Sequence, residues 1–71
     1  MSTQPLPVEA RNRLRRIIEA LGGAYPAARA LGVERMSLRR AADGGAVRPS
    51  TAIVLGAAVE RLSVLFPELR R

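Results

Sequence analysis

Cysteine, histidine, lysine and tryptophan are all absent from this 71-residue sequence. Without cysteine or histidine the chain has no disulfide, no thiolate nucleophile, no imidazole base and none of the usual zinc ligands. The carboxylates are scattered, and no two of them are arranged for general acid–base catalysis; they are Glu9, Glu19, Glu34, Asp43, Glu60 and Glu68. We therefore expect no catalytic residue, no metal site and no cofactor.

Aromatic residues and long apolar runs are also scarce. The sequence has one tyrosine and one phenylalanine, and alanine supplies much of its 48% apolar content. A chain of this length allows one domain and removes about 60% of its unfolded surface from water. No run approaches the roughly 18 apolar residues of a membrane span, and no charged start precedes an apolar segment. We expect a cytoplasmic, nucleoid-associated protein with no membrane partner and no evident small-molecule substrate.

All twelve basic residues are arginine, and the formal net charge is +6. Two interpretations of this choice remain open: arginine offers a bidentate fork to phosphate and guanine, and a G+C-rich genome favours arginine codons. The charge itself favours a polyanionic partner, nucleic acid before an anionic membrane surface. The paired glycines at 22–23 and 44–45 are no phosphate loop, because the preceding strand and the following lysine are missing.

The stretch 24–42 has the pattern of a helix-turn-helix. Ala28 is small enough for two helices to pass closely, Gly32 permits the left-handed conformation of a tight turn, and Leu38 is a large apolar anchor. Around it, apolar periodicity and breaker residues predict an all-α domain of four to five helices. The expected helices are Val8–Leu21, Pro26–Leu31, Glu34–Ala42 and Ser50–Leu65. Residues 1–7 are expected to be a flexible lead-in, 8–66 the domain and 67–71 a charged tail.

The helix 34–42 is the predicted DNA-reading element. With Leu38 at the centre of its buried face, an advance of about 100° per residue turns Ala41 and Ala42 inward and Met36, Arg39 and Arg40 outward. The amino-terminal half of such a helix reaches deepest into the major groove. We therefore expect base contacts from Arg35, Met36 and Ser37, and from Arg39 and Arg40 one turn further along. The alternative is an exposed basic face that reads no bases.

Several residues outside this helix are candidates for phosphate contacts. Arg48 precedes the amino terminus of the last helix, where Ser50 or Thr51 is able to cap, and helix amino termini attract anions; an ordinary capped helix start is the alternative. Tyr25 has the alternatives of donating to a phosphate or stapling the second helix onto the core. Arg29 points away from the inward residues of that helix. The arginines of the first helix suit either phosphate contacts or a solvated face: Arg11, Arg13, Arg15 and Arg16.

The last helix has apolar residues on more than one face. A stripe of Leu55, Val59, Leu62 and Phe66 is expected to pair with a second copy, and dimers of this kind bind half-sites about 34 Å apart. The alternative is that the stripe only covers the core of the first three helices.

The segment AARALGVERMSLRRAADGGAVRP resembles the DNA-binding helix-turn-helix of Cro/C1-type (XRE-like) phage and bacterial repressors, over roughly residues 14–62. Ala28, Gly32, Val33 and Leu38 stand where that family has its small residue, turn glycine, following apolar residue and second-helix anchor. The resemblance implies a lambda-repressor-like fold, and it places Arg35, Met36 and Arg40 at positions that usually meet base edges. Two positions depart from the family: Ala24 or Tyr25 replaces a glutamine, and Glu34 replaces a capping Ser or Thr.

The segment AARALGVERMSLRR is also similar to the carboxy-terminal helix-turn-helix of Fis-type nucleoid proteins. Little should follow the second helix in that family, whereas here Gly44, Gly45 and Pro49 lead into another long helix. The sequence thus predicts a sequence-specific double-stranded DNA-binding protein, a small repressor of phage or mobile-element type. The alternative from another class is a protein-interaction module, an antitoxin or adaptor that uses the helix 50–65.

Overall fold

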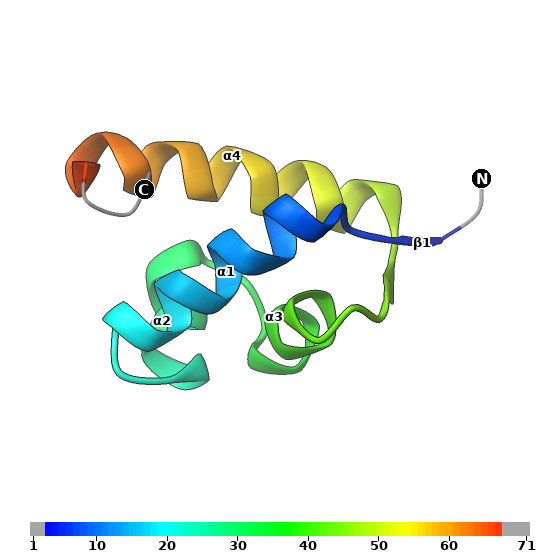
Figure 1. The fold of residues 1–71 in the computed structure, drawn as a ribbon, viewed down its shortest axis with the longest axis horizontal. Helices are drawn as coiled ribbons and strands as arrows, with labels where there is room; N and C mark the ends of the chain where they lie inside the picture. Colours follow the sequence, from blue (N-terminus) through cyan, green and yellow to red (C-terminus); the bar gives the residue numbers. More distant parts are fainter. Residues whose placement is uncertain (1–2, 68–71) are drawn as a thin grey trace.

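The computed structural model describes residues 3–67, which form an all-α fold with a short antiparallel strand pair. Helix α4 lies across one side of the molecule, α2 and α3 lie on the opposite side, and α1 runs between them (Figure 1). Four helices are present in this range, at the lower end of the predicted number. The elements are β1 (Gln4–Pro5), α1 (Val8–Ala20), α2 (Ala24–Leu31), α3 (Arg35–Ala42), β2 (Ala46–Val47) and α4 (Pro49–Leu65).

The turn between α2 and α3 is set by Gly32, whose backbone is left-handed at φ 73° and ψ 32°. The amide of Val33 donates to the carbonyl of Ala28 at 3.0 Å, and the amide of Gly32 donates to that of Arg29 at 3.3 Å. This pair of bonds satisfies carbonyls that the helix end leaves free, and glycine adopts the left-handed conformation without a Cβ penalty. Helix α2 starts two residues before the predicted Pro26, which lies inside its first turn.

The core is built from the apolar faces of all four helices. The predicted inward residues of α3 are confirmed: Leu38, Ala41 and Ala42 are 0%, 0% and 2% exposed. The buried apolar cluster comprises Leu14, Ile17, Ala27, Ala28, Leu31, Leu38, Ala41, Ala42, Val47, Leu55, Ala58, Val59 and Leu62. Within residues 3–67, no helix is both long enough and apolar enough to cross a membrane.

The predicted dimer stripe of α4 is wrong for three of its four members. Leu55, Val59 and Leu62 are 2%, 7% and 8% exposed because they cover the core of the same molecule. Phe66 alone remains substantially exposed, at 43%. The outward apolar residues of α4 are a different set: Ile53, Val54, Val64 and Leu65.

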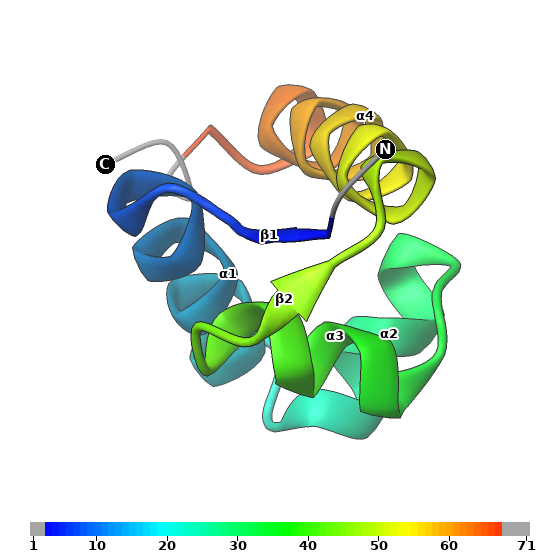
Figure 2. The same ribbon diagram turned by 90° about the vertical axis from the view of Figure 1, so that its right-hand side faces the viewer.

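The described part of the amino-terminal segment, expected to be a flexible lead-in, pairs with the loop after α3. Gln4 pairs with Val47 and Pro5 with Ala46 (Figure 2). Leu6 packs against the core beside this pair. The sequence pattern did not predict the pairing, because two-residue strands have too few residues to show alternation.

Two helix starts also differ from expectation. Helix α4 begins at Pro49 with Arg48 as its N-cap residue, and neither Ser50 nor Thr51 supplies a side-chain cap. Proline suits the first helical position because its missing N–H has no partner there in any case. Helix α3 begins at Arg35, and Glu34 is its N-cap residue without a side-chain hydrogen bond.

Candidate nucleic-acid interface

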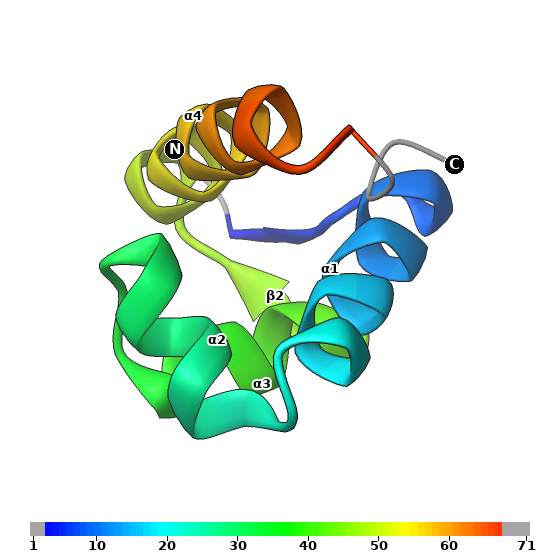
Figure 3. The same ribbon diagram turned by 90° about the vertical axis from the view of Figure 1, so that its left-hand side faces the viewer.

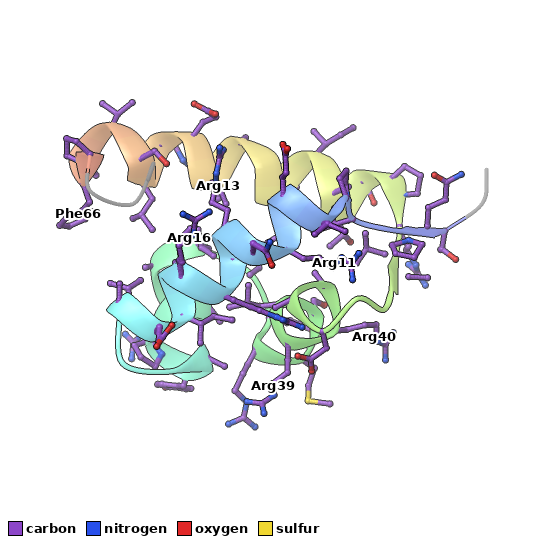
Figure 4. All side chains as sticks on the ribbon, in the orientation of Figure 1. Arg11, Arg13, Arg16, Arg39, Arg40 and Phe66 are labelled. Carbon is purple, nitrogen blue, oxygen red and sulfur yellow. The ribbon has the colours of Figure 1, made fainter. Side chains whose placement is uncertain are left out.

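Helix α3 turns a basic surface outward. Leu38, Ala41 and Ala42 hold its other side in the core. The α3 outer face, as we call it, consists of four exposed residues: Arg35, Met36, Arg39 and Arg40. Arg39 points away from α4, whereas Arg40 points toward the side on which β1 lies (Figure 4). The fifth predicted base-reading residue, Ser37, is half-buried.

Two hollows flank α3, so that the helix forms a ridge between them. The α1-side hollow has a volume of about 530 Å³ and the β2-side hollow about 480 Å³. The α1-side hollow is lined by Arg15, Ile18, Glu19, Gly22, Gly23, Arg39, Ala42 and Asp43. The β2-side hollow is lined by Thr3, Glu34, Met36, Ser37, Arg40, Ala46, Val47, Arg48 and Thr51.

The charges of the two hollows differ. In the α1-side hollow two arginines face two carboxylates, which leaves no excess charge. In the β2-side hollow Arg40 and Arg48 stand against Glu34 alone. The excess of positive charge makes the β2-side hollow the better place for a phosphate group.

The predicted phosphate-contacting residues fall into two groups. Arg48 and Thr51 line the β2-side hollow together with Arg40, and Ser50 is exposed in the first turn of α4. Tyr25 and Arg29 are exposed on α2 and line neither hollow. The guanidinium carbon of Arg29 lies 5.9 Å from the centroid of the Tyr25 ring, a cation–π distance. With 59% exposure, Tyr25 does not staple α2 onto the core.

Two arginines of α1, left open between solvent and phosphate by the sequence, bind the protein backbone. Nε of Arg15 donates to the carbonyl of Ala42 at 3.0 Å, at the carboxyl end of α3. A cation suits that end, because helix carbonyls are free there and the dipole is negative. Nε of Arg11 donates to the carbonyl of Leu6 at 3.1 Å, just after β1. The spacing of four residues places both arginines on one face of α1, but it does not indicate a bond to a distant carbonyl.

Two glycines after α3 make room for the side chains of Arg40 and Arg11. A Cβ at Gly45 would lie 2.6 Å from Cγ of Arg40, so the glycine lets the Arg40 stem lie against the loop backbone. A Cβ at Gly44, whose φ is +89°, would lie 2.8 Å from Nη1 of Arg11. The loop thus leaves room for the stem of Arg40, which lines the β2-side hollow. Sequence reasoning treated this pair only as a break before α4.

No protein-family model, no curated protein and no solved structure matches the chain. The surface is therefore interpreted from its own residues and geometry. Its distinguishing features are the exposed arginines of α3, the flanking hollows and the excess positive charge on the β2 side.

Proposed function

We propose that the protein binds double-stranded DNA in a sequence-specific manner, with α2 and α3 acting as a helix-turn-helix. The observation that carries the proposal is the α3 outer face. It presents three exposed arginines on an eight-residue helix, and this helix forms a ridge between two hollows. The Cro/C1-type resemblance of the sequence supports the same conclusion and suggests a small transcriptional repressor with a lambda-repressor-like fold.

The dimensions of a duplex suit this arrangement. The major groove of B-DNA is about 12 Å wide and admits one α-helix, which is about 10–12 Å across with its side chains. With α3 in the groove, Arg35, Met36 and Ser37 approach the bases first, because they belong to its amino-terminal half. Arginine can grip O6 and N7 of guanine, and methionine can pack against a thymine methyl group. Arg39 and Arg40 follow one turn later.

The β2-side hollow then faces the phosphate backbone of one DNA strand. Arg40 and Arg48 supply the charge, and Thr51 supplies a hydroxyl. The amide groups at the start of α4 lie beside Arg48, its N-cap residue, and such amides bind phosphate oxygens. Contacts of this kind fix the register of the helix on the duplex without reading sequence.

Salt dependence tests the electrostatic part of the proposal. If about three to five phosphates are neutralised, affinity for a duplex falls roughly 40- to 500-fold when monovalent salt is raised fourfold. Fluorescence anisotropy with a labelled duplex of random sequence measures this slope. No binding at low salt, or binding that does not change with salt, would contradict the DNA proposal.

Selection of bound sequences from a random duplex library tests the sequence-specific part. A defined consensus is the expected outcome, and an unenriched pool would leave only electrostatic binding. The alternative of an antitoxin-like or adaptor-like protein-interaction module is favoured by one observation, the exposure of Ile53, Val64 and Leu65 on α4. It becomes the better function if duplex binding fails.

A further inference from the structure

In the described part of the chain, most of the exposed large apolar residues lie on α4 or at its C-cap. Ile53 and Val64 are 72% and 66% exposed on the outward side of this helix, and Leu65, at 71%, lies on the flank. Of the 17 residues of α4, only Glu60 and Arg61 are charged. A helix that is apolar on all sides is ordinarily buried on all sides. We infer that this surface binds a second copy of the same chain, α4 against α4 in antiparallel orientation.

The spacing of the outward residues is complementary to itself. At about 100° per residue, Ile53, Ala57 and Val64 lie within about 40° of one another around the helix. We call this stripe, with Gly56, Glu60 and Arg61, the α4 outer face. A two-fold axis midway between Ile53 and Val64 sets Ile53 of each copy against Val64 of the other, as an isologous contact requires.

The centre of the α4 outer face has two small residues, Gly56 and Ala57, and one charged residue of each sign, Glu60 and Arg61. The same axis sets Glu60 opposite Ala57 of the other copy and Arg61 opposite Gly56. Gly56 is exposed, and a Cβ built on it would have no neighbour within 4 Å. Small residues let the helix axes approach and leave room for the long side chains. Glu60, whose Oε1 already lies 3.9 Å from Nη1 of Arg13 in its own chain, then comes near the Arg61 of the other copy as well.

Charge also selects a second copy over a strongly charged partner. The whole chain carries a net charge of +6, and two copies repel each other through most surfaces. The α4 outer face carries one glutamate and one arginine, and Arg13 of α1 adds a second positive charge beside Glu60. Counting Glu60, Arg61 and Arg13, its net charge is +1 against +6 for the whole chain, so two copies meet there with little charge repulsion.

The arrangement determines where two copies would hold DNA. In all three ribbon views α4 and α3 lie on opposite sides of the core (Figures 1, 2 and 3). A two-fold axis in the contact plane of α4 reverses the outward direction, so the two α3 outer faces point away from each other. Given the proposed DNA binding, on which this step rests, such a pair joins two separate duplexes and does not lie along one palindrome.

The contact is expected to be weak. A helix of 17 residues is about 25 Å long. One face of it buries less than the roughly 800 Å² per partner of a standard interface. The pair should therefore form at high micromolar concentration and dissociate on dilution.

The mass of the protein in solution tests the pairing without DNA. The wild-type protein should rise from 7.7 kDa toward twice that value as its concentration is raised, in sedimentation equilibrium. Ile53→Glu should remain at the monomer mass, because it puts a charge into the stripe. Val8→Glu is the matched control, since Val8 is also an exposed helical aliphatic, at 59%, and should still dimerise. A wild-type monomer at every concentration, or an Ile53→Glu dimer, would overturn the inference.

Capture of a second duplex tests the opposed arrangement. A duplex fixed to beads, loaded with wild-type protein, should retain a free labelled duplex, and beads loaded with Ile53→Glu should retain at least fivefold less. A wild-type dimer that binds the fixed duplex but captures no second one would overturn the arrangement. Wild-type protein that does not bind the fixed duplex would overturn the proposed function and the bridging with it, whereas the mass measurement decides the pairing independently.

Discussion

Helices α3 and α4 share one core and present opposite kinds of surface. Leu38 of α3 and Leu55 of α4 are both fully buried in the same cluster. On their outward sides α3 carries three arginines in eight residues, and α4 carries two charges in 17. Packing fixes only one side of each helix. The other side is free to suit a partner, and we assign DNA to α3 and a second copy to α4.

The two helices are also tethered differently to α1. Arg15 reaches α3 with a hydrogen bond of 3.0 Å to a backbone carbonyl. Arg13 extends toward α4 (Figure 4), where it meets Glu60 at 3.9 Å with both side chains well exposed. The tether to α3 is therefore the firmer of the two, which suits the proposed role of α3, since a helix that reads DNA must keep a fixed orientation.

Truncation of Leu38 in the common core should disturb the outer faces of both α3 and α4, because both helices are positioned by that core. Leu38→Ala is expected to reduce the free energy of unfolding by about 2–5 kcal/mol, the cost of a buried leucine truncation with the cavity it leaves. A domain this small has little stability to lose. Circular dichroism against temperature should show a large loss of the folded state.

Met36→Ala is the matched control on the same helix. Met36 is 67% exposed, so its truncation should change the free energy of unfolding by less than about 0.5 kcal/mol. Equal losses for the two variants would mean that α3 is not seated as described.

Truncation of an α3 arginine should test whether the outer face of α3 reads DNA bases. Arg40→Ala is expected to weaken binding to a selected sequence by about 1–3 kcal/mol and to change binding to random duplex little. A loss confined to the selected sequence reflects a base contact, whereas a phosphate contact at the rim of the β2-side hollow would weaken both duplexes alike. Titration of both duplexes by fluorescence anisotropy separates base reading from simple charge.

Arg16→Ala removes the same charge from an exposed position on α1 that lines neither hollow. It should weaken both duplexes by less than about 0.5 kcal/mol, as expected for a charge remote from the groove. If Arg40→Ala lowers both affinities equally, α3 supplies charge without reading bases.

Substituting glycine by alanine should lower the folding stability at the α2–α3 turn and raise it inside α4. Gly32→Ala is expected to cost about 1–2 kcal/mol of folding stability, because Gly32 is left-handed at φ 73°. Gly56→Ala lies inside α4 with open space around the added methyl group, so it should stabilise the monomer by about 0.5–1 kcal/mol. Chemical denaturation at low protein concentration compares them. A neutral Gly32→Ala would contradict the described turn.

The sequence predicted the α2–α3 unit well because its signals are local. A small residue, a turn glycine and an apolar anchor at fixed spacing specify where Ala28, Gly32 and Leu38 go, and all three lie where expected. The inward face of α3 followed from periodicity alone. The predicted outward residues Met36, Arg39 and Arg40 are exposed for the same reason.

Predictions that needed tertiary information fared worse. Which side of α4 faces the core depends on how the other helices approach it, so Leu55, Val59 and Leu62 were assigned to a dimer that they cannot form. The β1–β2 pairing joins positions about forty residues apart, and nothing local indicates it. The hydrogen bond from the Arg15 side chain to the Ala42 carbonyl could not be predicted for the same reason, since solvent, phosphate and a distant carbonyl all suit an arginine.

The smallest expected effect concerns the two tethers. Arg15→Met keeps most of the side-chain stem but removes the donor to the Ala42 carbonyl, and it should cost about 0.5–1.5 kcal/mol of folding stability. Arg13→Met removes the same charge but only an exposed pair with Glu60, and it should cost about 0–0.5 kcal/mol. Thermal denaturation of both variants in low and high salt separates them, because salt screens the exposed pair more than the partly buried hydrogen bond. If Arg13→Met proves the costlier, α1 holds α4 more firmly than α3, and the described difference between the two tethers is reversed.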